Sequence, residues 1–466
     1  MSGDHILHLH QGAITTRDAW CAVVQAQYGS TVDVYDYQGD PYRFGYIAVS
    51  FFVFNFCLWL HHAALEQGVS RLFFVSRDGK LFYDAYQRMF PSSPIEVKYL
   101  YCSRKALDYV ALYDEVDIEN AVYSIKHIHE LSLFQVIEQI TSLDLQLVLL
   151  MQPQHAAGLA PEQKMKSHQA ALQLLMRFSD QILAQSQIDR DAYLQYLQQA
   201  GVDRPYAAIV DIGYECTAQK RLSELLKVSL HGFYVATFKE ALKKIHSPHR
   251  SSSFLFNYQD RKLDTFGVVS YVALYETIFS DVTGSFLKIK NSEQGLQPVF
   301  YHSPIDQPRA AFVRSISAGC VEAISTMTEI VNTALCTVHA ARPDEAVDLL
   351  YQFFRQPRHK ADVQMLRGVY FAYGAFHRSD SYIVADTTAS TAAYSVWIEG
   401  EALLKSSDVF FYRVLQQSSQ YAERTLMRLA LADKFKRKYC KNRPLFFRDS
   451  KSALFRAYYR YVGARF

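Results

Sequence analysis

The stretch Arg71–Lys80, RLFFVSRDGK, decides the fold class of this chain. Four apolar residues, Leu72 to Val75, run into a polar turn, and a helical pattern follows from Leu81 to Phe90. A short apolar run that ends in turn residues and leads into a helix is typical of a buried parallel strand. Polar groups at the carboxyl end of such a strand lie where open α/β sheets bind their ligands. Asp78 is therefore the first candidate functional residue.

Three further apolar runs extend this pattern along the chain. They are Glu96–Cys102, Tyr206–Val210 and Gly232–Thr237, and a helical pattern at Ala218–Lys227 separates the last two. Strands that alternate with helices pair in parallel through right-handed crossovers. The expected fold class is therefore α/β, with a Rossmann-like parallel sheet.

The spacing of these runs divides the chain into parts. At 466 residues the chain is too long for one ordinary core. Residues 111–203, between the second and third strands, have a mostly helical pattern, which predicts an inserted helical cap. We expect an N-terminal segment at 1–42, an α/β core with this insertion at 43–245, a mixed and then mostly helical C-terminal region at 246–433, and a basic aromatic tail at 434–466.

Polar residues stand at the ends of three predicted strands: Asp78, Ser103 and Asp211. The carboxyl ends of parallel strands lie at one edge of a sheet, so these side chains are expected to share a site. Mg²⁺ binds one or two carboxylates together with water and phosphate oxygens. Asp78 and Asp211 are therefore the candidate metal ligands. The alternative is that each strand-end residue only caps the helix that follows it.

The neighbours of these residues suit a phosphate group. The hydroxyl of Ser103 and the planar guanidinium of Arg104 match phosphate oxygens. Gly79 and Gly213 let backbone N–H groups approach an anion, and a helix that starts near Thr217 adds the positive end of its dipole. We therefore expect these five residues to bind phosphate.

The sequence resembles the haloacid dehalogenase (HAD)-like superfamily in five phrases: FFVSRDGKLF, YLYCSRKAL, IVDIGYECTAQKRLSELL, HGFYVAT and LYETIFSDVTGSFLKI. They are most similar to the branch found with glycosyltransferases of bacterial surface-polysaccharide biosynthesis, over about residues 43–300. The resemblance implies phosphoryl transfer through an aspartyl-phosphate, with Mg²⁺ as cofactor and a phosphorylated sugar or similar small molecule as substrate. It also implies glycosyltransferase partners. A cytoplasmic protein is expected from the cysteine content, and a peripheral position at the inner membrane is expected from the basic tail.

The resemblance assigns roles only where residues match. In the superfamily an Asp nucleophile is followed two residues later by an acid/base Asp. If Asp78 takes the second place, Ser76 stands where the nucleophile belongs, and a serine there removes the attacking carboxylate. If Asp78 is itself the nucleophile, Lys80 stands where the acid/base belongs. Asp78 and Ser76 are thus the candidate catalytic residues, and catalytic activity itself stays an open question.

The remaining motifs match in part. Ser103 matches the second-strand hydroxyl that holds phosphate, and Asp211 matches the metal-binding acid. Glu215 is the candidate substitute for the second acid that usually follows it. The cation of the third motif has four candidates: Arg104, Lys105, Lys164 and Lys166.

Two functions follow from this comparison. The first is a Mg²⁺-dependent phosphohydrolase or phosphotransferase that acts on a sugar phosphate in polysaccharide biosynthesis. The second is a catalytically degenerate member that keeps the phosphate pocket and serves as a binding or scaffold module for glycosyltransferases. Turnover of a substrate would indicate the enzyme, and binding of a ligand without turnover would indicate the module.

The stretch Phe44–Leu60 is uncharged over 17 residues, which touches the lower limit for a membrane span. The helical pattern continues through polar residues toward Gly68, so a buried core helix is the preferred interpretation. The seven cysteines form no C-x-x-C pair, which favours a reducing compartment over a disulfide framework.

Several single residues have two interpretations. Glu276 is a further site candidate or a buried partner of an arginine. His127 and His129 are expected at the surface. The alternating histidines near the N-terminus, His5, His8 and His10, either bind metal together or belong to a solvated terminus.

The last 33 residues, 434–466, hold eleven Lys and Arg and a single acid, Asp449. Basic residues interleaved with Phe and Tyr contact anionic membrane surfaces or acidic partners, or pack their rings back on the body of the protein. No nucleic-acid-binding fold motif accompanies them, so nucleic acid is not expected as a partner.

Overall fold

The computed structural model describes residues 14–125, 127–151, 162–244, 251–257, 268, 270–301, 307–333, 338–371, 381–385 and 394–405. Two features of the sequence lie outside the described residues. They are the alternating histidines near the N-terminus and the basic aromatic tail at 434–466.

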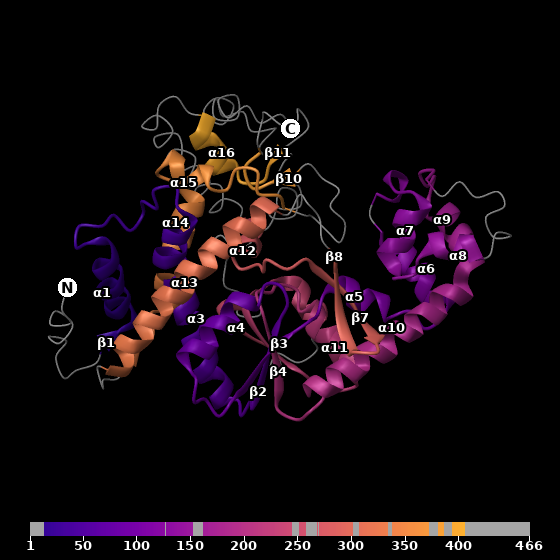
Figure 1. The fold of residues 1–466 in the computed structure, drawn as a ribbon, viewed down its shortest axis with the longest axis horizontal. Helices are drawn as coiled ribbons and strands as arrows, with labels where there is room; N and C mark the ends of the chain where they lie inside the picture. Colours follow the sequence, from indigo (N-terminus) through magenta and orange to yellow (C-terminus); the bar gives the residue numbers. More distant parts are fainter. Residues whose placement is uncertain are drawn as a thin grey trace, which may run out of the picture.

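A five-stranded parallel sheet forms the centre of the fold (Figure 1). Its strands, in spatial order, are β3 (Glu96–Leu100), β2 (Arg71–Val75), β4 (Ala207–Asp211), β5 (His231–Thr237) and β6 (Ser251–Asn257). Every neighbouring pair is parallel, so the α/β class and the four predicted strands are confirmed. The fifth strand begins beyond residue 245, where we expected the core to end. The sheet therefore extends past the predicted boundary.

Strand β2 positions the site. Leu72, Phe73 and Phe74 are buried on both faces of the sheet, as the run of apolar residues predicts for a parallel strand. The chain passes from β2 to β3 on one side and later returns to β4 on the other side of β2. The strand order thus reverses between β2 and β4. Ligands of open α/β sheets bind in the crevice beyond the carboxyl ends of the strands at such a point.

One apolar core joins the sheet to helices from both halves of the chain. The main contributors are α1 (Thr16–Tyr28), α2 (Pro41–Phe44), the π-helix η2 (Gly45–Val49), α3 (Ser50–Glu66), α4 (Lys80–Met89), α13 (Gln307–Thr333) and α14 (Pro343–Arg355). The indole of Trp20 donates to the carbonyl of Ile47 at 2.8 Å, which fixes α1 on η2. The N-terminal helix is therefore part of the core rather than a separate unit.

The apolar stretch expected as a core helix lies in the continuous helix Pro41–Glu66. Among the described residues, this helix is long and apolar enough to cross a membrane, and the bent pair α7 (Leu133–Ile140) and α8 (Leu145–Met151) would be a second such segment if it formed one span. In the structure, 83% of the apolar window of Pro41–Glu66 is buried inside the protein. Its contacts include α13 and α4.

The segment between β3 and β4 is helical, as expected. It contains α5 (Arg104–Tyr109), α6 (Glu115–Ser124), the 3-10 helix η3 (Ile128–Glu130), α7, α8, α9 (His168–Leu175) and α10 (Ser179–Ala200). Helices α6 to α9 form a lobe with its own apolar core, to the right of the sheet in Figure 1. The guanidinium of Arg190 on α10 donates to the carbonyls of Val110 and Leu112, which fixes the entry of the chain into this lobe.

The described part of the C-terminal region is mixed and then mostly helical. After β5 and β6 come α12 (Val272–Ile278), the antiparallel hairpin β7 (Ser285–Ser292) and β8 (Gly295–Tyr301), and the long helix α13. Helices α14, α15 (Lys360–Gln364) and α16 (Ile398–Lys405) follow, with two short strand pairs, β1 (Ile14–Thr15) with β9 (Val338–His339) and β10 (Ser381–Tyr382) with β11 (Tyr394–Ser395). Helix α11 (Thr217–Leu226) connects β4 to β5.

Candidate functional site

A cavity of about 1290 Å³ lies at the carboxyl end of the sheet, between the strand ends and the insertion lobe. It is larger than the roughly 300–1,000 Å³ of an ordinary small-molecule site. Asp78, Ser103 and Asp211 all line it, so the structure brings the three strand ends together. Residues of α12, α13 and the insertion lobe complete the wall.

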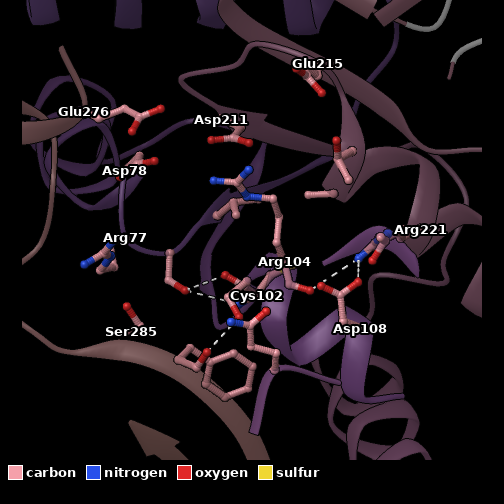
Figure 2. A pocket seen from close by; sticks show the side chains of 18 of the residues that line it. Arg77, Asp78, Cys102, Arg104, Asp108, Asp211, Glu215, Arg221, Glu276 and Ser285 are labelled. Carbon is pink, nitrogen blue, oxygen red and sulfur yellow. Dashed lines mark hydrogen bonds and ion pairs between the residues drawn. The ribbon is translucent and has the colours of Figure 1, made fainter. Parts of the chain in front are cut away.

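Three carboxylates gather on one side of this cavity: Asp78, Asp211 and Glu276 (Figure 2). Burial and the neighbouring charge of Asp78 raise the pKa of Asp211 to about 8. The same two causes raise the pKa of Glu276 to about 7. Burial also raises the pKa of Asp78, although three arginines oppose the shift. Burial thus favours the protonated forms of these carboxyl groups, and a cation placed among them would favour their charged forms.

Arginines face the carboxylates from three different elements. Arg77 follows β2, Arg104 begins α5 and Arg309 lies in the first turn of α13. Each lowers the pKa of Asp78 by its positive charge. Figure 2 shows the side chain of Arg104 extending from α5 toward Asp211. Guanidinium groups that converge on one cavity are suited to an anion such as phosphate.

A substitution of Arg309 tests the role of the arginines in phosphate binding most directly. Its side chain is buried and donates to the hydroxyl of Ser280 at 2.5 Å. We expect Arg309→Met to weaken the binding of inorganic phosphate by about 10–100-fold, the usual worth of a charge-assisted hydrogen bond. Calorimetric titration of the full chain measures the affinity. Arg314→Met, at an exposed arginine of the same helix, is the matched control. Equal phosphate affinity in the two variants would contradict a role for Arg309.

The two serines of the predicted site use their hydroxyls within the protein. Ser76 Oγ donates to the carbonyl of Cys102 at 3.0 Å and accepts from the Cys102 N–H at 3.1 Å. Ser103 Oγ donates to the carbonyl of Phe286 at 2.7 Å and accepts from the N–H of Ala106 at 3.0 Å, so it caps α5. Each hydroxyl proton therefore has a backbone acceptor. A phosphate oxygen would have to replace that acceptor to receive a hydrogen bond from either serine.

The two glycines of the predicted site differ. Gly79 does not line the cavity, and its N–H donates to the carbonyl of Val75 at 2.8 Å. The expected contact of this N–H with an anion is therefore wrong. A Cβ at Gly79 would lie 2.6 Å from the carbonyl oxygen of Val75, which explains the glycine by close packing. Gly213 does line the cavity, with φ at +137°, and its N–H bonds to the carboxylate of Asp211.

The N-terminal end of α11 also lines the cavity, through Glu215, Thr217 and Ala218. Lys244 donates to the carboxylate of Glu215 at 2.5 Å and to the hydroxyl of Thr217 at 2.7 Å. Glu215 is exposed, and Lys244 already neutralises the charge that a second metal-binding acid would supply. The helix end itself has no side-chain cap.

Of the four candidates for the third-motif cation, the structure places one in the cavity. Arg104 lines it. Lys105, the second residue of α5, is buried and its amine lies over the ring of Tyr109, and burial lowers its pKa to about 8. Lys164 and Lys166 are exposed on the insertion lobe and do not line the cavity. Lys80, at the position of the usual acid/base, forms an ion pair with Asp84 at 2.6 Å.

Three features of the site have no signal in the local sequence. Arg309 comes from a helix more than 200 residues after β2, and Arg221 of α11 forms an ion pair with Asp108 at the cavity wall. Tyr214 lines the cavity, and its buried hydroxyl has no hydrogen-bond partner among the described residues. Buried hydroxyls are usually satisfied, so this one is suited to a ligand or to water.

The carboxylates fit magnesium better than a transition metal. Mg²⁺ takes one or two carboxylates and completes its shell with water and phosphate oxygens, so Asp78 and Asp211 provide a suitable donor set. Within the described residues, a cluster of ligand atoms tight enough to enclose an ion by itself lies elsewhere, at His127, His129 and Glu130. In the acidic site, water and phosphate oxygens would complete the coordination of a metal.

Comparison of the chain with protein-family models and with curated proteins finds no match.

Proposed function

We propose that this chain is a HAD-like, Mg²⁺-dependent phosphohydrolase or phosphotransferase that acts on a sugar phosphate in polysaccharide biosynthesis. The observation that supports it is the cavity at the point where the strand order reverses, with Asp78, Asp211 and Glu276 opposite a group of arginines. Carboxylates and guanidinium groups that line one cavity are the parts that phosphoryl transfer requires. The insertion lobe serves as the cap over this cavity.

Asp78 is the nucleophile in this proposal. Its carboxylate attacks phosphorus as the ester P–O bond breaks, and Arg77, Arg104 and Arg309 stabilise the charge on the phosphoryl oxygens. Glu276 gives its proton to the leaving alkoxide and then removes a proton from the water that hydrolyses the aspartyl-phosphate. Asp78 and Asp211 would hold magnesium, which would neutralise charge on the phosphoryl group.

Glu276 is expected to take the role for which Lys80 is unsuitable, because its pKa of about 7 matches a proton donor and acceptor at neutral pH. We expect Glu276→Gln to lower kcat by about 10²–10⁴-fold and to remove the part of the pH–rate profile that titrates near 7. Steady-state rates between pH 5 and 9 measure both effects. Glu224→Gln, at an exposed glutamate of α11, is the control. An unchanged pH profile in Glu276→Gln would exclude Glu276 as the acid/base.

A catalytically degenerate binding module for glycosyltransferases is the second candidate. The hydrogen bonds of Ser76 favour it, because among the described residues the hydroxyl at the usual nucleophile position bonds to the Cys102 backbone and not to a base. In such a module the arginines would bind a phosphorylated ligand, and turnover would be absent. For either candidate function, we propose a cytoplasmic protein that lies near the inner membrane.

An assay of the purified full chain against a panel of sugar phosphates, with Mg²⁺ and with a chelator, tests the proposed function. Release of phosphate that requires Mg²⁺ supports the enzyme. Binding of a sugar phosphate without any release, measured by calorimetry on the same samples, supports the module. Neither release nor binding across the panel would overturn both.

A further inference from the structure

We propose that His127, His129 and Glu130 on the insertion lobe bind a divalent transition-metal ion, with zinc as the best match. These residues lie at the 3-10 helix η3, far in sequence from the strand ends that form the acidic site. The proposal concerns a second ligand site and does not depend on the proposed phosphoryl chemistry.

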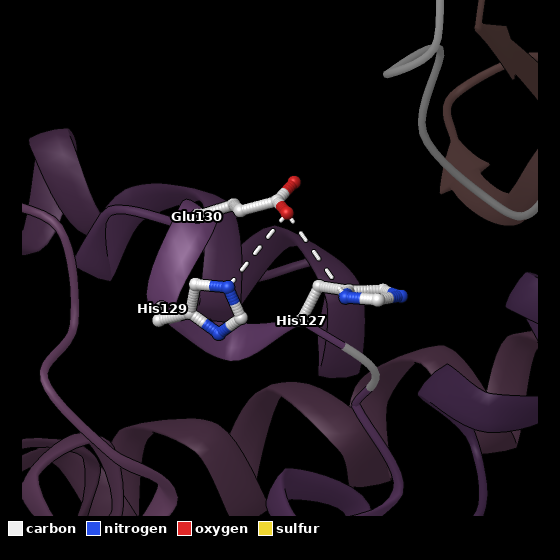
Figure 3. A group of neighbouring side chains, drawn as sticks. All are labelled: His127, His129 and Glu130. Carbon is white, nitrogen blue, oxygen red and sulfur yellow. Dashed lines mark ion pairs between the residues drawn. The ribbon is translucent and has the colours of Figure 1, made fainter. Parts of the chain in front are cut away.

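The three side chains converge on one point. The Nδ1 atom of His127 lies 4.0 Å from the Oε1 atom of Glu130, and the Nε2 atom of His129 lies 3.8 Å from the same oxygen (Figure 3). All three ligand atoms lie within 4.8 Å of one another. Zinc binds such atoms at about 2.0–2.2 Å, which places the ligands of a tetrahedral site about 3.4 Å apart. Small rotations of these exposed side chains close the remaining difference.

The donor set indicates which metal fits. Imidazole nitrogen suits zinc and its first-row neighbours, whereas magnesium and calcium prefer oxygen ligands. Two histidines and one carboxylate leave a fourth tetrahedral position open, as in zinc sites that bind water or substrate rather than in closed structural sites. The predicted surface position of both histidines is confirmed, and it leaves the site accessible to an ion.

The two His–Glu ion pairs alone do not explain why these three side chains converge. Exposed pairs of this length contribute little to stability even when the histidines are protonated. His127 nevertheless adopts the left-handed conformation, with φ 54° and ψ 40°, which is unfavourable for a residue with a Cβ. A metal ion bound by both rings and the carboxylate offsets that cost.

The cluster lies where a bound ion can contact a ligand in the cavity. His127 and Glu130 line the same cavity as Asp78 and Asp211, from the wall that the lobe contributes. A metal with an open coordination position there binds an anionic or hydroxylated group of a molecule that spans the cavity. The large size of the cavity, about 1290 Å³, leaves room for such a two-ended ligand.

Titration of the metal-free full chain with ZnCl₂ tests the proposal, with binding measured by calorimetry and by the visible absorption of bound Co²⁺. We expect one zinc ion per chain at this site, with an affinity that His129→Ala and Glu130→Gln each lower at least tenfold. An excess of Mg²⁺ is expected to leave the zinc bound. His62→Ala, at an exposed histidine of α3, is the matched control.

The alternating histidines near the N-terminus are the competing zinc site. A chain in which His5, His8 and His10 are all changed to Gln is expected to keep the tetrahedral Co²⁺ spectrum and the zinc affinity. Loss of zinc binding in that triple variant, or wild-type affinity in His129→Ala, would overturn the assignment to the lobe. Circular dichroism of each variant verifies that the fold is intact.

Discussion

Asp78→Asn is expected to lower the rate of phosphate-ester hydrolysis by roughly 10³-fold or more at saturating Mg²⁺. An amide cannot attack phosphorus as an anion, and it is a poorer ligand for Mg²⁺ than a carboxylate. The side chain of Asp78 follows the end of β2 and lies beside three arginines, which would bind the phosphoryl group that its carboxylate attacks. Phosphate release from the best substrate of the sugar-phosphate panel measures the loss.

Two further variants show whether the loss is specific. Asp84→Asn changes an aspartate of α4 that pairs with Lys80 and does not line the cavity, so we expect nearly wild-type turnover. Ser76→Ala is expected to reduce turnover far less than Asp78→Asn, because the Ser76 hydroxyl bonds to the Cys102 backbone. The opposite order, with Ser76→Ala inactive and Asp78→Asn active, would make Ser76 the nucleophile.

The sequence predicted the part of the fold that rests on local apolar patterns. β2, β4 and β5 are nearly unbroken apolar runs, because strands covered by helices on both faces bury every side chain. β6 begins with three serines at Ser251–Ser253, so half of it has no apolar signal. Its position comes from parallel pairing with β5, which is a tertiary interaction. The sheet therefore extends past the predicted core boundary at residue 245.

The candidate site was predictable to the extent that topology determines it. Parallel strands bring Asp78, Ser103 and Asp211 to one edge whatever the loops between them do. The partners of each side chain are not determined in this way. The bond of Ser103 to Phe286 and the approach of Arg309 both depend on how segments nearly 200 or more residues away pack against the sheet. The convergence of His127, His129 and Glu130 depends on one left-handed residue.

Asp211→Asn is expected to stabilise the metal-free protein at alkaline pH. The folded-state pKa of Asp211 is about 8, well above the usual aspartate value of 3.8. Between these two values the folded chain keeps a proton that the unfolded chain releases, so the free energy of unfolding falls as pH rises through this window. The raised pKa of Glu276, about 7, acts in the same direction. An amide at position 211 removes the contribution of Asp211 to this loss.

Thermal unfolding between pH 4 and 9 measures the difference. We expect the variant and the wild type to melt at similar temperatures near pH 4 and the variant to melt a few degrees higher at pH 8. Mg²⁺ binds the charged carboxylates, so at pH 8 it is expected to raise the melting temperature of the wild type more than that of the variant. Asp203→Asn, at an exposed aspartate before β4, should follow the wild-type curve. If the Asp211→Asn curve also follows the wild type, with and without Mg²⁺, then Asp211 is neither a buried proton site nor a metal ligand.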